Sequence, residues 1–440
     1  MKAISKSAID ILDKRILVTA FLSVFLIHGE MLFKKLSWYD DLGITFSGNI
    51  TPVTPPMIHG RFFYHWLVIW RAYLSGPESL PAVYGAIGAI FMALMVNIII
   101  KQFQIEKSLP QFAFVLIFVS IPAVAGHFGY MESSIYDFFG AFLCVLSGYI
   151  ICRNDVKVSA VQLSACILAF SIGEYQCYIT FFLTIALVHF IGQILKEKYT
   201  WADYFKKALC YVGTGIIGII FYLVILKINL AITSLKLASY AGTDTFGITS
   251  FAGYLQRIAD AYSDFFVPNI EAEYCMFPFH FAGWHRILLA SMILSAVILM
   301  ILLVKNGYAV SAFQFMLALV LLPAAINFNM ILYDKQNMHS LHQYHLCMLF
   351  VLWYILARTL SLFWKEGIFR KISSCMCSFT AVVYLIFGCL CIRYDNCCYM
   401  LAEFRHQRVT VYYTTLITRI QSLDGYNPGS PVVISMQGKR

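Results

Sequence analysis

The chain has 440 residues, of which 60% are hydrophobic and 12% are charged, and its formal net charge is +9. About a quarter of the residues of a soluble domain are charged, so this composition, with a mean hydropathy of +0.74, excludes one large soluble core and indicates a polytopic membrane protein. The positive charge does not indicate nucleic-acid binding, because Lys and Arg lie mostly in short segments between apolar runs.

Long apolar runs predict an all-α bundle of about eleven transmembrane helices, because a spanning helix needs about 20 mostly apolar residues. The runs, in chain order, are 16–33, 83–100, 109–126, 138–152, 158–173, 178–195, 208–230, 287–304, 308–328, 342–360 and 373–392. The fifth and sixth runs are the least distinct pair, and we divide them at Gly173 and Glu174.

The distribution of Lys and Arg orients this bundle. Six short segments between or before the runs all carry Lys or Arg, and they are 1–15, 101–108, 153–157, 196–207, 305–307 and 361–372. Cytoplasmic loops are enriched in these residues, which predicts a cytoplasmic N-terminus and, with an odd number of helices, an external C-terminus. We therefore expect a bundle over 1–392 with external loops 34–82 and 231–286, followed by an external segment over 393–440.

The external segments contain their own predicted elements. Residues 60–74 are aromatic and aliphatic with interspersed basic residues, which favours an amphipathic helix on the membrane surface over a short twelfth span. Residues 254–266 have helical apolar spacing and predict a second surface helix. The tail is expected to be helical from 399 to about 422, with a turn at 424–429 and a strand-like stretch at 431–436.

Five of the acidic residues on the predicted external face are candidate site residues. Asp40 and Asp41 follow the first helix, Glu132 and Asp137 lie between the third and fourth, and Glu174 lies between the fifth and sixth. Carboxylates gathered in this way suit general-base chemistry on a sugar hydroxyl or binding of a divalent metal, which is a possible cofactor. The alternative is that they are ordinary solvated loop acids.

Several basic residues on the same face are candidate anion ligands. Arg61 shares the first external loop with the acidic pair, and Lys335 precedes His339, His342 and His345 at the outer end of the tenth helix. Spacing of three residues places the His side chains along one helix face. They suit binding of a lipid phosphate, although a metal site and an ordinary interfacial helix end are the alternatives.

Four stretches of the chain resemble a known family. They are YDDLG (39–43), HGRFF (59–63), EYQCYITF (174–181) and a C-terminal stretch with RYDN (393–396), TRIQSL (418–423) and PVVIS (431–435). In this order and topology the chain resembles the GT-C class of membrane glycosyltransferases. Within that class it is similar to the bacterial serotype-converting O-antigen glucosyltransferases, the Gtr type II family.

This resemblance implies an inverting glycosyltransferase of the bacterial inner membrane, with a periplasmic C-terminus and periplasmic loops. It implies undecaprenyl-phosphate glucose as the donor, the O-antigen of lipopolysaccharide as the acceptor, and a separate donor synthase and donor flippase as partners. Asp40 or Asp41 would be the general base, and the substrate-binding residues would include Arg61, Glu174, Tyr175 and Gln176. The family leads us to expect Arg near the outer end of the tenth helix, where this chain has His342 and His345.

Two other functional classes remain as alternatives. A transporter or flippase would place acids inside the spans, whereas the acids here cluster in the outer segments. An O-antigen polymerase or ligase is expected to have Arg-rich outer loops, whereas 231–286 contains only Lys236, Arg257 and Arg286 as Lys or Arg. A non-catalytic scaffold gives no reason for the aspartate pair.

Overall fold

The computed structural model describes residues 12–34, 36, 56–75, 80–105, 108–153, 157–238, 248–267, 282–333, 340–363 and 367–429. Every regular element in these ranges is a helix, and no strand occurs in them. This confirms the predicted all-α class. The acidic pair Asp40 and Asp41, Lys335 and the strand-like stretch at 431–436 all lie outside the described residues.

The first half of the chain forms α2 to α11. Their bounds are α2 Lys14–Phe33, η1 Pro56–His59, α4 Phe62–Ser75, α5 Pro81–Gln102, α6 Ser108–Ser120, α7 Pro122–Gly129, α8 Met131–Arg153, α9 Val158–Glu174, α10 Tyr178–Lys196 and α11 Trp201–Thr233. Pro122 divides α6 from α7, because proline has no N–H to continue the helical ladder but is well suited to the first turn of a new helix.

The second half forms α12 to α18. Their bounds are α12 Phe251–Phe266, α13 Ala282–Lys305, α14 Ala309–Val320, α15 Leu322–Ile326, α16 Phe328–Leu332, η4 Ser340–Leu346, α17 Cys347–Phe363 and α18 Gly367–Gln421. Across the described ranges, ten helical stretches are long and apolar enough to cross a membrane. The remaining predicted span, the fifth run at 158–173, corresponds to α9, which is apolar but has 17 residues. The protein is therefore a multi-pass membrane protein.

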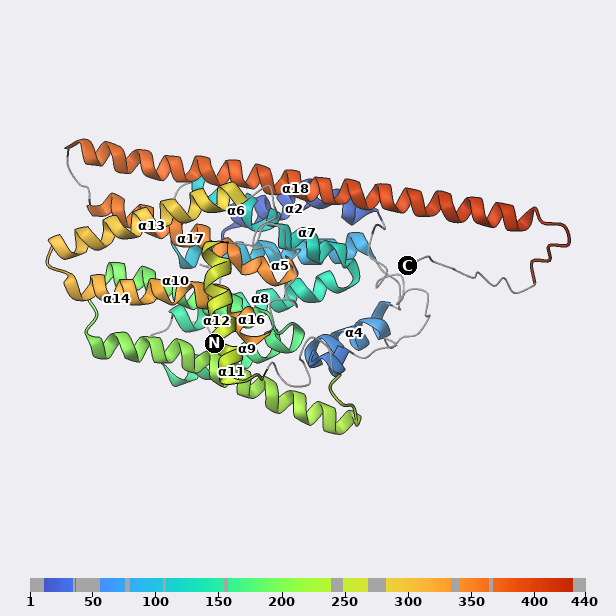
Figure 1. The fold of residues 1–440 in the computed structure, drawn as a ribbon, viewed down its shortest axis with the longest axis horizontal. Helices are drawn as coiled ribbons and strands as arrows, with labels where there is room; N and C mark the ends of the chain where they lie inside the picture. Colours follow the sequence, from blue (N-terminus) through green and yellow to red (C-terminus); the bar gives the residue numbers. More distant parts are fainter. Residues whose placement is uncertain are drawn as a thin grey trace.

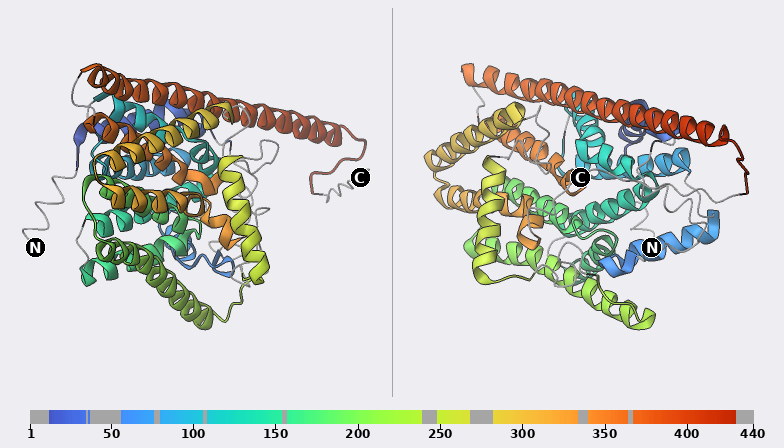
Figure 2. Two further views of the ribbon diagram at one scale, coloured as in Figure 1. Left: turned by 60° about the vertical axis from the view of Figure 1, so that its left-hand side comes forward. Right: turned by 45° about the vertical axis from the view of Figure 1, so that its right-hand side comes forward.

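The long helices lie side by side along the long axis of the molecule (Figure 1). Both views of Figure 2 show α12 crossing this direction on the outside of the bundle, where it packs against α15 and α16. The last helix, α18, follows one side and projects beyond the others toward the C-terminus (Figure 1). It has 55 residues, which corresponds to a length of about 80 Å.

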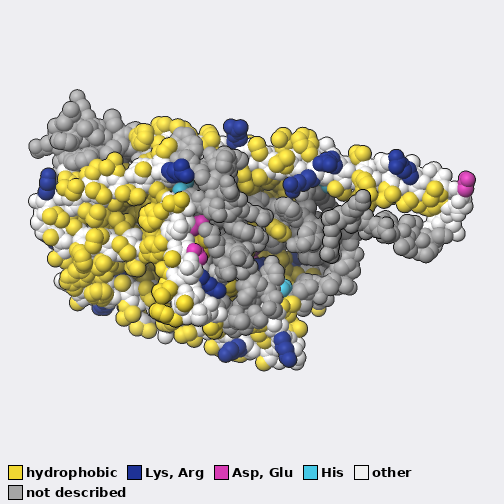
Figure 3. Space-filling view, viewed as in Figure 1, with side chains coloured by type: hydrophobic (Ala, Val, Ile, Leu, Met, Phe, Trp, Pro, Cys, Tyr) yellow, Lys and Arg dark blue, Asp and Glu magenta, His cyan; other side chains and the backbone are white. Residues whose placement is uncertain are grey.

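Exposed apolar side chains identify the surface that faces lipid. Helix α11 exposes a stripe whose members recur at every third or fourth position, and they are Leu209, Val212, Ile216, Ile220, Val224, Ile228 and Ile232. Such a stripe would be costly in water but matches a hydrocarbon environment. Figure 3 shows hydrophobic side chains gathered over the left-hand part of one face, with few Lys or Arg among them.

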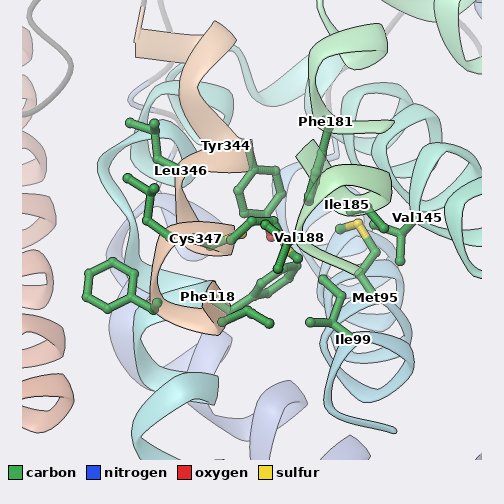
Figure 4. Close-up of a cluster of buried hydrophobic side chains, with 14 of the residues drawn as sticks. Met95, Ile99, Phe118, Val145, Phe181, Ile185, Val188, Tyr344, Leu346 and Cys347 are labelled. Atoms are coloured by element: carbon green, nitrogen blue, oxygen red, sulfur yellow. The ribbon is translucent and has the colours of Figure 1, made fainter. Parts of the chain in front are cut away.

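The interior of the bundle is packed with aromatic and aliphatic side chains (Figure 4). Tyr344 of η4 lies at its centre, with its ring centroid 5.0 Å from that of Phe118 and 5.8 Å from that of Phe181. All three side chains are almost fully buried. Because Tyr344 anchors η4 between α6 and α10, it also fixes the neighbouring His342 and His345 relative to those helices.

The predicted surface and tail helices are present. The stretch 60–74 corresponds to α4, which packs against α9 and is not among the candidate spans, and 254–266 corresponds to α12. The tail is helical to Gln421 and turns at Gly425, which has a φ of +79°. Helix α18 continues without a break through 392, and its RYDN stretch brings a fully buried Asp395 into the bundle. A separate external segment after 392 stays a prediction.

Candidate functional site

A tight turn places Arg61 at the end of the bundle where α9 ends and α10 begins, which we call the site end. Gly60 has a φ of +76°, a left-handed conformation that glycine adopts without steric cost. Its carbonyl accepts a hydrogen bond from the Tyr222 hydroxyl of α11 at 3.1 Å. The turn therefore fixes the point at which Arg61 leaves the backbone, immediately before α4.

Tyr175 connects Arg61 to the far side of the site. It lies between α9 and α10, and the Arg61 guanidinium carbon is 4.2 Å from the centre of its ring, which is a cation–π contact. The Tyr175 hydroxyl forms a hydrogen bond with His342 Nε2 at 2.5 Å. Segments that are far apart in the sequence, before α4, after α9 and in η4, therefore meet at this one side chain.

Two carboxylates lie next to Tyr175. Glu174 is the last residue of α9 and is 1% exposed, and Asp137 of α8 is 7% exposed. Asp137 Oδ2 accepts a hydrogen bond from Ser133 at 3.0 Å and lies 3.2 Å from His127 Nδ1. Burial, and then the charge of Asp137, raise the pKa of the Glu174 carboxyl well above its usual value, while Arg61 acts in the opposite direction.

A glycine provides the space for Glu174. A Cβ added at Gly140 of α8 would lie 2.2 Å from Glu174 Oε2 and 2.8 Å from a ring carbon of Tyr178. Both distances are far below van der Waals contact. The carboxylate therefore lies directly against the backbone of α8, and its position depends on the absence of a side chain at Gly140.

Arg61 is half-buried and remains charged. Burial alone would lower the pKa of its guanidinium, but Tyr175, Glu174 and Asp137 outweigh that effect and raise the pKa. Among the described residues Arg61 forms no ion pair, because none of the described pairs includes it. A charged guanidinium that is held in place without a bound carboxylate is able to bind an anionic ligand.

Glu132 occupies a different position from the other predicted acids. It forms a buried ion pair with Arg71 of α4, and Arg71 Nη1 also donates to the Tyr84 hydroxyl at 2.8 Å. The side chains of Glu132 and Arg71 are 2% and 9% exposed. This pair links α4 to α5 and α8. The contribution of Glu132 to substrate binding stays a prediction, and its observed contacts are those of a structural ion pair.

Gln176 and His345 bond to backbone groups. Gln176 Nε2 donates to the His59 carbonyl at 2.7 Å, which holds the turn that carries Arg61. His345 is buried, and its Nε2 lies 2.7 Å from the Ile326 carbonyl, so it donates there and links η4 to α15. Of the substrate-binding residues predicted from the sequence, Arg61, Asp137, Glu174, Tyr175 and His342 come together around one point.

Several further residues of this site were not identified from the sequence. Tyr178 donates from its hydroxyl to the Asp137 carbonyl at 2.6 Å, and His127 faces the Asp137 carboxylate. Tyr333 lies near Cys177 and Arg61, and burial raises its pKa to about 12. The sequence offered one signal for them, which is that His127 and Tyr333 fall at the predicted outer ends of spans. Many aromatic residues occupy such positions, so this signal does not distinguish site residues.

The predicted acids and histidines do not form a metal-binding group within the described residues. In those ranges, no group of three or more His, Cys, Asp or Glu side chains could hold a metal ion. The described residues of the site place a fixed cation, Arg61, beside two interacting carboxyls and the tyrosines Tyr175 and Tyr178. This combination can bind a phosphate through Arg61 and sugar hydroxyls through Glu174 and Asp137.

Comparisons with known proteins identify the family. Searches of curated proteins and of solved structures gave no match. A comparison with protein families matches residues 29–350 to the family described as glucosyl transferase GtrII. The matched range covers more than half of the chain and includes the whole site, together with Asp40 and Asp41. The chain therefore belongs to the GtrII glucosyl transferase family, and is a glycosyltransferase of the membrane.

Proposed function

We propose that the protein transfers a sugar from an undecaprenyl-phosphate donor to O-antigen at the periplasmic face of the inner membrane, and that this sugar is glucose. The observation that carries this proposal is the meeting of Arg61, Glu174, Asp137, Tyr175 and His342 at one end of a bundle of membrane helices. A lipid-linked donor presents its phosphate and sugar at the membrane surface, where this end of the bundle lies, so the transfer needs no soluble nucleotide sugar.

The direction of transfer is supported by charge. The six short segments predicted at the opposite end, 1–15, 101–108, 153–157, 196–207, 305–307 and 361–372, all carry Lys or Arg. By the positive-inside rule the opposite end is cytoplasmic and the site end is periplasmic. The N-terminus is then cytoplasmic and the C-terminus periplasmic, and the donor must be made by a synthase and brought across by a flippase before this protein uses it.

The proposed reaction is an in-line displacement with inversion. An acceptor hydroxyl oxygen bonds to the anomeric carbon of the donor sugar, the bond from that carbon to the phosphate oxygen breaks, and undecaprenyl phosphate leaves. Asp40 or Asp41 takes the hydroxyl proton as general base. Both lie outside the described residues, and their role is supported by the sequence alone, which puts them in the same predicted external loop as Arg61.

The residues of the site that the structure describes bind the donor and orient its sugar. Charge grows on the phosphate as its bond to the sugar breaks, and the Arg61 guanidinium stabilises that charge. Glu174 and Asp137 accept hydrogen bonds from sugar hydroxyls, which aligns the anomeric carbon with the acceptor. Tyr175 and His342 fix the position of the Arg61 guanidinium. The Tyr175 ring contacts the guanidinium, and His342 forms a hydrogen bond with the Tyr175 hydroxyl.

A transfer assay in membranes tests this proposal. Radiolabelled undecaprenyl-phosphate glucose and lipid-linked O-antigen are incubated with the wild type, with Asp40→Asn and Asp41→Asn singly, and with the double variant. Asp424→Asn, an exposed acid in the turn after α18, is the matched control. We expect label in the polymer for the wild type and the control and none for the double variant.

Three outcomes would change the proposal. Full transfer by the double variant would remove the general-base assignment. Absence of transfer from wild-type membranes, with the protein present at normal levels, would exclude glucose on this carrier and require other polyprenyl-phosphate sugars to be tested. Transfer of whole repeat units rather than single sugars would favour a polymerase or ligase.

A further inference from the structure

Helix α18 continues beyond the bundle at the site end. Glu403 forms an ion pair with Lys34, which directly follows α2, and residues 404–415 are all exposed. Figure 1 shows this part of α18 projecting past the other helices. About 27 Å of helix separates Glu403 from Gln421 at 1.5 Å per residue, whereas the headgroup layer of a bilayer is about 5–8 Å deep. The projection therefore extends past the lipid headgroups.

A groove runs along one face of the projection. It has a volume of about 910 Å³, and the described residues that line it all belong to α18, from Leu401 to Tyr412. They include Phe404, Arg405 and Arg408, which have the three- and four-residue spacing that places side chains on one helix face. The groove begins beside Glu403 and leads away from the bundle.

The groove carries positive charge that no carboxylate neutralises. Arg405 and Arg408 line it, and neither forms an ion pair among the described residues. From 404 to 423 the sequence contains no Asp or Glu, and Arg419 adds a further cation. Figure 3 shows Lys or Arg among hydrophobic side chains along this projection. Guanidinium groups of this kind bind carboxylates through paired hydrogen bonds, so the charge of the groove fits an acidic ligand.

Two exposed rings lie in the same groove. Phe404 is 52% exposed and Tyr412 is 63% exposed, and their separation in the sequence places them about 12 Å apart along the helix axis. The apolar face of a sugar ring can pack on such a side chain, while polar groups nearby bind the sugar hydroxyls. A ligand that contacts both rings and both guanidinium groups is therefore an extended chain rather than a single lipid headgroup.

We propose that this groove binds the acceptor and that the acceptor is an acidic polysaccharide. Its sugar rings pack on Phe404 and Tyr412, and its acidic groups bind to Arg405 and Arg408. A lipid-linked chain leaves the membrane in the direction in which α18 projects, so the groove holds the part of the chain that lies beyond the reacting sugar. This inference rests on the proposed function and deepens it, because it gives the acceptor a charge and a second point of attachment.

Binding of labelled oligosaccharides to the purified full-length protein in detergent tests this proposal without any transfer step. Fluorescent alginate oligosaccharide, a chain of uronic acids, and dextran oligosaccharide of the same length, which is uncharged, are titrated separately and followed by anisotropy. The variants are Arg405→Gln, Arg408→Gln and Tyr412→Ala. Arg419→Gln and Tyr413→Ala are the matched controls, because both residues are exposed on the same helix but lie outside the lining.

We expect the wild type and both controls to bind alginate more tightly than dextran. Each of the three groove variants should weaken alginate binding about threefold to tenfold, the usual effect of losing one charged or aromatic contact at an exposed site. Equal binding of alginate and dextran by the wild type would overturn the proposal. Equal weakening by Arg419→Gln would also overturn it, as would displacement of alginate by short-chain phosphatidylglycerol, since the groove would then bind lipid.

The transfer assay separates this inference from the proposed function. Arg408→Gln should raise the KM for an acidic acceptor and leave kcat unchanged, because the groove binds the ground state and the transition state equally. Normal transfer together with alginate binding that ignores the groove variants would reject the groove alone. Alginate binding that depends on the groove, together with no transfer by the wild type, would reject the proposed reaction and keep the groove as a binding site for acidic polysaccharide.

Discussion

Arg61 and Arg71 lie at the two ends of one stretch of chain, on either side of most of α4, and each is close to acids from α8 or α9. Arg71 forms a closed group, with the carboxylate of Glu132 and the hydroxyl of Tyr84 bound directly to its guanidinium. Arg61 forms an open group, in which the guanidinium lies over Tyr175 and interacts with Glu174 and Asp137 without an ion pair among the described residues.

The difference shows how composition can mislead about function. Both groups contain an arginine, a buried acid and a tyrosine, but in the closed group a directly bound carboxylate already neutralises the guanidinium. Breaking it leaves an uncompensated buried charge, which destabilises the protein. An open group has charge that is held in place and not yet neutralised, and this is the arrangement that a phosphate or sugar completes.

The largest expected effect comes from breaking the closed group. Glu132→Ala leaves the Arg71 charge buried and should lower the free energy of unfolding by about 3–5 kcal/mol. Unfolding in SDS or by heat in detergent measures this. The double variant Arg71→Met/Glu132→Leu should recover most of the loss, since it removes both charges. A Glu132→Ala protein that unfolds normally but does not transfer sugar would place Glu132 in the substrate site instead.

Removing the cation of the open group should act on transfer rather than on stability. Arg61→Ala should lower kcat/KM about a hundredfold to a thousandfold, the usual effect of losing a group that stabilises developing charge. Its cost in stability should be only about 1 kcal/mol, from the lost cation–π contact. Arg61→Lys should recover part of the activity, and Arg153→Ala at the opposite end of the bundle should change neither quantity. A large drop in the unfolding temperature of Arg61→Ala would contradict this distinction.

The geometry of the open group can be changed without removing a charge. Gly140→Ala introduces a Cβ 2.2 Å from the position that Glu174 Oε2 occupies, so the carboxylate must move. A displacement of this size should lower transfer about tenfold to a hundredfold. Gly192→Ala is the matched control, because its Cβ would lie 3.6 Å from Ile355 in ordinary contact. Equal activity of the two variants would show that the position of Glu174 does not matter for transfer.

The raised pKa of Glu174 gives the open group a pH dependence. The folded state binds this proton more tightly than the unfolded state, so the resulting stability is complete below the unfolded pKa of about 4.3 and is lost as pH rises through the folded pKa. Between pH 5 and 8 the wild type should therefore lose more thermal stability than Glu174→Gln does. Parallel unfolding curves across that range would exclude a raised pKa.

The smallest expected effect concerns the bond between Tyr175 and His342. Tyr175→Phe keeps the ring beneath Arg61 and removes one hydrogen bond, which is worth about 0.5–1.5 kcal/mol. Transfer should fall by less than about tenfold, and Tyr175→Leu, which also removes the ring, should fall further. The rates of sugar transfer by both variants, measured in membranes, provide this comparison. If Tyr175→Phe is as inactive as Tyr175→Leu, the hydroxyl rather than the ring is the important group.

Much of this organisation was predictable from the sequence. The apolar runs located the spanning helices, because the thickness of the bilayer fixes their length. The order of the runs also predicted that Arg61, Glu132, Asp137, Glu174 and His342 share one end of the bundle, since successive helices alternate in direction. The GtrII family was recognised from short stretches around these same positions, and residues 29–350 confirm it.

Which acid meets which arginine was decided only by the tertiary structure. Helices such as α5 and α13 are apolar on all sides, so their sequences do not show which face meets protein and which meets lipid, both of which are apolar. The rotation of α8 that turns Glu132 toward Arg71 and Asp137 toward Glu174 follows from close contacts such as the one at Gly140. A cavity between α5, α10 and α17 has the same origin, because it exists only where three separately predicted helices pack together.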